Sequence, residues 1–201
     1  MAYWKRKHTT LAAILVAALT ATLFTAPTHA KELAIWDQLQ GTNPKGYVLL
    51  MRHALAPGVG DPENFNVNDC STQRNLSDEG RQDARDIGQW LQRREVKILR
   101  VESSRWCRAK ETAQLLNIGK VRPNKNLDSL FQETNLESHP QTANIKKRIQ
   151  SHRNTRGLLV FVGHFVNFQA VAGVSLDSGE GVLIKATPSG EFKVMGYSPK
   201  P

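Results

Sequence analysis

The chain has 201 residues, 40% of them hydrophobic, and a formal net charge of +9 at pH 7. That length suits one domain with a sizeable core. The charge fits an anionic partner such as a phosphorylated metabolite or an anionic envelope. No recognition motif and no interleaving of basic with aromatic residues is present, so we expect no nucleic-acid partner.

The beginning of the chain has the organisation of a secretory signal peptide. Three basic residues, Lys5–Lys7, precede an uncharged and mostly apolar run from Leu11 to Phe24. Thr28 and Ala30 then supply small residues at positions −3 and −1 of a possible cleavage site. This order of charged, apolar and small residues is typical of an exported protein.

Cleavage after Ala30 would divide the chain into a signal peptide, 1–30, and a single mature domain, 31–201. Removing the three basic residues of the signal lowers the net charge to +6. We therefore expect a periplasmic or secreted protein. The alternative is a retained membrane anchor, because the uncharged stretch 8–29 approaches the length of a spanning helix, although threonines and Pro27 dilute it. Membrane contact is expected only through such an uncleaved signal.

The next elements predicted are a strand and a long loop. Gly46–Met51 is a short, continuous apolar run, which indicates a strand buried on both faces. Arg52 and His53 stand at its carboxyl end. The segment Ala56–Asn75 is rich in Pro, Gly, Asn and Asp and predicts a long loop. A loop of that length in a compact domain is usually functional.

A helix, a strand and a second helix follow. Ser77 is the predicted N-cap of a helix that continues to about Arg93, with acidic residues in the first turn, where the helix dipole favours them. Its apolar residues recur at helical spacing. A strand is expected over Lys97–Val101 and a helix over Arg108–Leu116.

The second half of the chain contains one irregular segment, two more helices and three more predicted strands. In chain order they are irregular Leu127–Pro140, a basic and outward-facing helix at Ala143–His152, a buried strand at Gly157–Val162, a helix at Phe165–Val171, and a closing hairpin of Val182–Ala186 and Phe192–Gly196. Buried strands that alternate with helices predict a layered α/β domain.

Three of the predicted strands end in charged or imidazole groups. These are Arg52 with His53, the segment 104–108, and His164. In open α/β sheets, ligands bind beyond the carboxyl ends of the strands, so we expect these groups at one end of the sheet. Guanidinium groups match phosphate oxygens in pairs, and a neutral imidazole can attack phosphorus. The sequence therefore predicts a phosphoryl-binding pocket.

The two cysteines, Cys70 and Cys107, both lie in the mature segment. In an exported protein, two cysteines suggest a disulfide. Each is expected near the same rim of the sheet, one in the long loop and one before a helix. The alternative is two separate buried thiols. No spacing typical of a metal site is present, so we expect no metal.

Five blocks, in order, span Tyr47 to Ile184. They are Met51-Arg52-His53-Ala54, Leu76-Ser77-Asp78-Glu79-Gly80-Arg81, Ser103-Ser104-x-x-x-Arg108-Ala109-x-x-Thr112-Ala113, Phe161-Val162-Gly163-His164 and Gly179-Glu180. Together they resemble the histidine phosphatase superfamily, which has the phosphoglycerate-mutase-like fold. The resemblance implies a three-layer α/β/α sandwich with a mostly parallel central sheet. It also implies an acid-phosphatase-type hydrolase of small phosphomonoesters that needs no cofactor.

The resemblance assigns roles to the matched residues. His53 would be the nucleophile that becomes phosphorylated. Arg52, Arg108 and His164 would hold the phosphoryl oxygens and stabilise the charge that develops on them, and His164 would thereby take part in catalysis.

The general acid is where the sequence departs from the family pattern. Many members place a glutamate within a glycine-rich block after the third strand, and that block is missing here. Glu133 is the candidate for protonating the leaving oxygen. Glu137, Asp61 and Asp69 are its rivals.

A narrower resemblance concerns 69–77 and the segment 106–108, which look like an exported bacterial branch of the superfamily. One relative in that branch acts on a heptose phosphate of the lipopolysaccharide core, which suggests envelope or sugar phosphates as a substrate class. Arg74 and Arg105 are expected only to guide anions. A phosphomutase and a phosphate-binding protein with little turnover are the alternative functions. Mutases of this family are longer between their motifs.

Overall fold

The computed structural model of the protein describes residues 29–198. The signal peptide expected at 1–30 lies almost entirely outside this range, and its cleavage stays a prediction. Among the described residues, no helix is long and apolar enough to cross a membrane.

Within the part of the chain that the structure describes, six strands form one sheet with the order β3-β2-β4-β1-β5-β6. They are β1 (Tyr47–Arg52), β2 (Ile98–Ser103), β3 (Val121–Pro123), β4 (Leu158–Gly163), β5 (Gly181–Ala186) and β6 (Phe192–Tyr197). The first four are parallel to one another, whereas β5 is antiparallel to both β1 and β6. The predicted mostly parallel sheet is confirmed.

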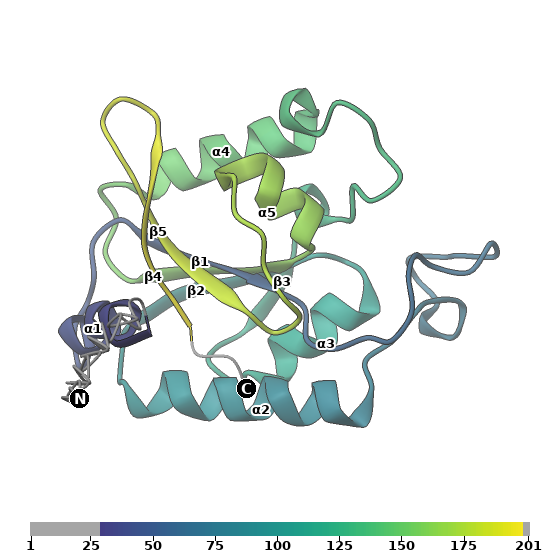
Figure 1. Cartoon of the computed structure of the whole chain (residues 1–201), viewed down its shortest axis with the longest axis horizontal. Helices are drawn as coiled ribbons and strands as arrows, with labels where there is room; N and C mark the ends of the chain where they lie inside the picture. Colours follow the sequence, from purple (N-terminus) through teal and green to yellow (C-terminus); the bar gives the residue numbers. More distant parts are fainter. Residues whose placement is uncertain (1–28, 199–201) are drawn as a thin grey trace, which may run out of the picture.

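Helices cover both faces of this sheet (Figure 1). They are α1 (His29–Leu39), α2 (Asp78–Arg93), α3 (Cys107–Leu115), α4 (Pro140–His152) and α5 (Phe165–Ala172). Three short 3₁₀ helices, η1 (Cys70–Thr72), η2 (Lys125–Leu127) and η3 (Leu136–Ser138), interrupt the loops. Residues from α1, α2 and α3 pack on one face of the sheet, and residues from α4 and α5 pack on the other. This is the predicted α/β/α arrangement.

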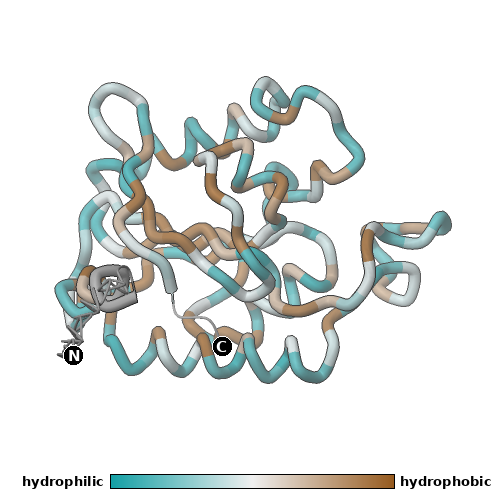
Figure 2. Tube along the Cα trace, viewed as in Figure 1, coloured by the Kyte–Doolittle hydropathy of each residue, from teal (hydrophilic) through white to brown (hydrophobic). Residues whose placement is uncertain are grey.

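Two hydrophobic cores explain why the central strands are continuous apolar runs. In β1, Leu49 and Met51 belong to the core beneath α2 and α3, while Val48 and Leu50 belong to the core beneath α4 and α5. Successive side chains of a strand point to opposite faces, so a strand covered on both faces must be apolar at every position. Figure 2 shows this hydrophobic interior, with hydrophilic residues along the outer faces of the helices.

The helix α2 begins where the sequence predicts, and its first turn approaches the chain just after β1. Ser77 is the N-cap, and its hydroxyl accepts a hydrogen bond from the Gly80 amide at 3.0 Å. A Cβ atom at Gly80 would lie 2.2 Å from the carbonyl oxygen of Leu55. Glycine is therefore required there for the helix to pack against the segment that follows His53.

Several boundaries differ from those predicted. The helix α4 begins three residues earlier, at Pro140, and packs Ile145 and Ile149 into the core while Lys147 stays exposed. The helix α1 and the edge strand β3 were not predicted. The long loop between β1 and α2 contains only η1 and projects at the right of Figure 1.

Candidate active site

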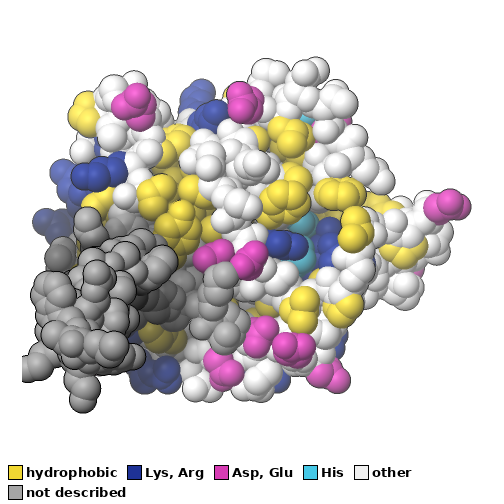
Figure 3. Space-filling view, viewed as in Figure 1, with side chains coloured by type: hydrophobic (Ala, Val, Ile, Leu, Met, Phe, Trp, Pro, Cys, Tyr) yellow, Lys and Arg dark blue, Asp and Glu magenta, His cyan; other side chains and the backbone are white. Residues whose placement is uncertain are grey.

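Three parallel strands end at one cavity. β1 ends at Arg52 and is followed by His53, β2 leads into Ser104, and β4 is followed by His164. Because β4 pairs with both β1 and β2 in parallel, these residues gather at one end of the sheet. The cavity, lined by Arg52, His53 and His164, has a volume of about 770 Å³. Figure 3 shows histidine and basic side chains in a hollow edged by hydrophobic groups.

Arginine, aromatic and acidic side chains complete the wall of this cavity. They come from the long loop, the beginning of α3, the segment before η3 and the beginning of α5. They include Asp61, Glu63, Phe65, Arg74, Trp106, Arg108, Phe131, Glu133 and Phe165.

The imidazole of His53 is held as a neutral ring with a defined tautomer. Its Nδ1 lies 2.7 Å from the carbonyl oxygen of Ala54, which can only accept, so Nδ1 carries the proton. Nε2 is therefore unprotonated, and it accepts a hydrogen bond from Nε of Arg108 at 3.2 Å. Burial, followed by the charge of Arg108, lowers the pKa of His53 to about 3. The ring is therefore neutral at physiological pH, with an electron pair on Nε2.

The second imidazole, His164, lies next to the first. The ring centroids of His53 and His164 are 5.3 Å apart, with an interplanar angle of 69°. Nε2 of His164 is 3.0 Å from Oγ of Ser104, which also accepts a hydrogen bond from the Trp106 amide. Burial is the main cause that lowers the pKa of His164 well below its usual value, and the charge of Arg108 adds to it. Ser104 therefore fixes the ring of a second neutral histidine.

Three guanidinium groups line the cavity. Arg108 is buried, and it connects His53 to the carboxylate of Asp61, with Nη1–Oδ1 and Nη2–Oδ2 distances of 2.7 and 3.2 Å. Arg52 donates from Nη1 to a backbone carbonyl at 3.1 Å and lies over the ring of Phe165. Arg74 donates to two carbonyls of the long loop. This concentration of positive charge suits an anionic ligand.

The structure separates the remaining candidates. Arg105 pairs with Asp128, with Nε 2.7 Å from Oδ2, and does not line the cavity. Glu133 does line it and is exposed, whereas Glu137 does not line it. Asp69 caps η1 by accepting from the Ser71 amide, away from the cavity. Of the four acidic candidates, only Glu133 and Asp61 reach the cavity wall.

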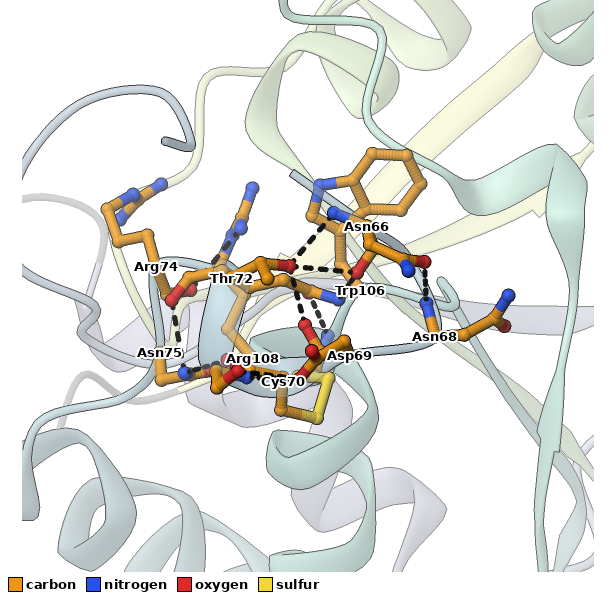
Figure 4. The surroundings of a disulfide bond; sticks show 12 residues. Asn66, Asn68, Asp69, Cys70, Thr72, Arg74, Asn75, Trp106 and Arg108 are labelled. Atoms are coloured by element: carbon orange, nitrogen blue, oxygen red, sulfur yellow. Dashed lines mark hydrogen bonds between the residues drawn. A yellow bond between two sulfur atoms is a disulfide. The ribbon is translucent and has the colours of Figure 1, made fainter. Parts of the chain in front are cut away.

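The structure contains the predicted disulfide. Cys70 in η1 and Cys107 at the first position of α3 are joined, with their Cα atoms 5.7 Å apart. The Cys107 amide also donates to Oε1 of Gln73 at 2.9 Å. Figure 4 shows this bond with Arg74 in the same loop and with Trp106 and Arg108 nearby. The disulfide thus fixes one end of the cavity-lining loop to the helix that carries Arg108.

Comparison with known proteins identifies the family. The sequence model of the histidine phosphatase superfamily (branch 1) matches residues 48–157, more than half of the chain. The protein therefore belongs to the histidine phosphatase superfamily. No curated protein sequence matches the chain.

Solved structures share the fold at low sequence identity. The protein histidine phosphatase SixA, complexed with tungstate, has a TM-score of 0.58 and 17% identity over 76% of this chain and 96% of its own. A mycobacterial glucosyl-3-phosphoglycerate phosphatase has a TM-score of 0.54 and 13% identity, over 77% and 99%. A phosphoserine phosphatase mutant from Entamoeba histolytica, complexed with phosphoserine, has a TM-score of 0.56 and 12% identity, over 76% and 96%. These likenesses confirm the phosphoglycerate-mutase-like fold.

Two features of the cavity were not predicted from the sequence. One is the contact of Ser104 with His164, although Ser104 lies in a matched block. The other is the pair of hydrogen bonds that Arg108 donates to the carboxylate of Asp61. The sequence offered a signal for Asp61 only in its place within a polar loop that follows His53.

Proposed function

We propose that this protein hydrolyses phosphomonoesters through a phosphohistidine formed on His53. The observation that carries the proposal is the state of that side chain. It is a buried, neutral imidazole whose unprotonated Nε2 accepts from Arg108 in a cavity lined by three guanidinium groups. The family, which is established, supports phosphatase chemistry at this place.

In the first half-reaction, the substrate's phosphoryl oxygens lie against Arg52 and Arg108, with His164 beside them. The lone pair of His53 Nε2 is released from the hydrogen bond donated by Nε of Arg108 and attacks phosphorus, and the bond from phosphorus to the leaving oxygen breaks. The imidazole gains positive charge as the N–P bond forms. Its Nδ1–H donates to the carbonyl of Ala54, and this hydrogen bond strengthens as the charge develops.

In the second half-reaction, water attacks phosphorus and the N–P bond breaks. The electron pair returns to Nε2, which restores the neutral ring and releases inorganic phosphate. The arginines stabilise the negative charge on the phosphoryl oxygens in both transition states. The first half-reaction also needs a proton for the leaving oxygen, and the carboxyls of Glu133 and Asp61 both lie on the wall of the cavity.

For the substrate class we propose envelope or sugar phosphates. Aromatic rings of Phe65, Trp106, Phe131 and Phe165 line the cavity, and such rings pack against the apolar faces of sugars. Phe65 and Trp106 are stacked, with centroids 4.9 Å apart. The resemblance to an exported branch supports the same class. The lowered pKa of His53 is compatible with an acid-phosphatase type, because the nucleophile stays neutral in acid.

Export itself is part of the proposal. A signal peptide cleaved after Ala30 would place the protein in the periplasm or outside the cell, where the Cys70–Cys107 disulfide is stable. Fractionation followed by N-terminal sequencing should find a chain that begins near Lys31 outside the cytoplasm. A full-length chain embedded in the membrane would contradict cleavage and indicate an anchored enzyme.

The activity is tested by screening the purified protein against sugar and envelope phosphates, with His53→Ala as the control variant. We expect phosphate release from at least one of these substrates and none from the variant. Transfer of phosphate between positions of the substrate would indicate a mutase. Tight phosphate binding without turnover would indicate a binding protein.

A further inference from the structure

Asp61 and the nucleophile His53 contact the same guanidinium group. Nε of Arg108 donates to Nε2 of His53, while Nη1 and Nη2 donate to the two carboxylate oxygens of Asp61 at 2.7 and 3.2 Å. The side chain of Arg108 is only 3% exposed and that of Asp61 15%. The end-on fork of Arg108, formed by Nη1 and Nη2, is therefore occupied by the carboxylate. A phosphoryl group that binds this end-on fork takes the place of the carboxylate.

Two further contacts would keep the displaced carboxylate at the cavity. Nε1 of Trp106 donates to Oδ2 of Asp61 at 3.0 Å, and the Arg74 amide donates to Oδ1 at 3.1 Å. Neither donor belongs to Arg108. The turn around Asp61 is in turn anchored by the side chain of Arg74, which donates to the carbonyl of Gly60 at 2.8 Å. These two donors would hold Asp61 at the cavity when a phosphoryl group takes its place on Arg108.

The same exchange changes the acidity of Asp61. Burial alone would raise the pKa of Asp61, but hydrogen bonds and charge from Arg108, with smaller contributions from Arg74 and Trp106, lower it overall. When a phosphoryl group takes over Arg108, the burial remains and an anion replaces the favourable partner. The pKa of Asp61 then rises, because a nearby like charge disfavours the ionised carboxylate.

Resting on the phosphatase function proposed above, we propose that Asp61 is the general acid of this enzyme. The substrate displaces it from Arg108, and it then protonates the leaving oxygen. Compared with Glu133, which is exposed on the cavity wall, Asp61 is tied directly to the guanidinium that contacts His53.

The protons balance over one turnover. The displaced carboxylate takes a proton from the monoanion of the substrate or from solvent. As His53 bonds to phosphorus, the P–O bond breaks, and the leaving oxygen receives that proton and departs as an alcohol. Asp61 is then ionised again, and the water that attacks the phosphohistidine keeps one proton in the new P–OH group and passes the other to a phosphoryl oxygen, so that inorganic phosphate leaves as H₂PO₄⁻. Once phosphate leaves, the carboxylate returns to Arg108.

The test compares two substrates that differ in their need for a proton. An alkyl phosphate requires protonation of its leaving oxygen, whereas the p-nitrophenolate of p-nitrophenyl phosphate leaves readily as an anion. Asp61→Asn should lower kcat on the alkyl phosphate by roughly 100-fold or more, and on the aryl phosphate by less than about 10-fold. Asp69→Asn, an equal change in the same loop outside the cavity, should match the wild type on both.

A binding measurement tests the displacement without turnover. Tungstate, titrated calorimetrically, should bind Asp61→Asn at least several-fold more tightly than the wild type, because no carboxylate competes for Arg108. Weaker or equal tungstate binding would show that the anion does not replace Asp61. If Asp61→Asn lost the same factor of kcat on both substrates, Asp61 would not be the general acid. The same conclusion would follow if Glu133→Gln, and not Asp61→Asn, lost more kcat on the alkyl phosphate than on the aryl phosphate. A wild-type protein that forms no phosphohistidine would instead refute the phosphatase function itself.

Discussion

Cys107, the residue directly before Arg108, is covalently joined to Cys70 in the loop that covers the cavity. The bond closes a separation of 37 residues. It connects the first turn of α3 to the segment from which Arg74 and Asp61 reach the cavity. The disulfide therefore couples the position of this loop to the position of Arg108.

Removal of the disulfide should lower both stability and activity. We expect Cys70→Ser with Cys107→Ser to lose about 2–4 kcal/mol of unfolding free energy, since the unfolded chain regains the entropy of an open loop. Urea denaturation measures the change. Dithiothreitol should destabilise the wild type and leave the double variant unaffected. Equal stability of oxidised and reduced wild type would contradict this prediction.

Gly80→Ala should disturb the site although Gly80 does not line the cavity. The added Cβ would lie 2.2 Å from the carbonyl oxygen of Leu55, two residues after His53. Because this neighbour is a backbone atom, the clash can be relieved only by shifting the main chain. Overpacking of this kind costs about 1–3 kcal/mol, and we expect a loss of activity with it. Gln82→Ala, on the exposed side of the same helix, is the matched control. Unchanged stability and kcat in Gly80→Ala would show that the close contact between Gly80 and Leu55 is not needed for stability or activity.

Arg108 and Arg105 provide a second matched pair. Arg108→Lys keeps a positive charge but loses the planar fork and the Nε–H donated to His53, so we expect kcat/KM to fall by roughly 100-fold or more. Arg105→Lys keeps the ion pair with Asp128 outside the cavity and should change kcat/KM little. Steady-state kinetics on one aryl phosphate decide the matter. If Arg108→Lys lost as little kcat/KM as Arg105→Lys, a positive charge at position 108 would be sufficient without the planar geometry of arginine.

The pH dependence follows from the pKa of His53, which is lowered from 6.5 to about 3. Only the neutral imidazole is a nucleophile, and a lowered pKa keeps it neutral as the pH falls. The kcat/KM of the free enzyme should therefore show no acid limb near pH 6.5, and should fall because of His53 only as the pH approaches about 3. The profile is measured with a substrate whose own ionisation is corrected for. A limb with its midpoint near 6.5 would mean that His53 is not desolvated as described.

The elements that could be predicted from the sequence are the strands covered on both faces of the sheet and the helix with a clear capping residue. β1 and β4 are apolar at consecutive positions because both faces of the sheet are covered. The start of α2 could be placed because Ser77 caps it. β3 was missed because three residues ending at Pro123 give no periodic signal. Helix α1 overlaps the predicted signal peptide at residues 29–30 and has no strong apolar periodicity of its own.

In the site, too, only the residues whose positions follow from a local sequence pattern could be predicted. Arg52, His53 and His164 end strands of the central sheet, so the topology alone brings them together. Asp61 lies in a loop whose path depends on Arg74 and on the disulfide, which are tertiary contacts without a local sequence pattern. Glu133, the candidate acid, lies on the cavity wall, but its contacts could not be inferred from the sequence.

Trapping the phosphohistidine intermediate tests whether phosphate passes through His53. The protein is mixed with p-nitrophenyl phosphate, quenched within milliseconds under alkaline denaturing conditions that preserve phosphohistidine, and digested for mass spectrometry. We predict one added phosphoryl group on the peptide that contains His53, and none in His53→Ala. Phosphate release by the wild type with no phosphorylated His53, or release at a similar rate by His53→Ala, would contradict the account.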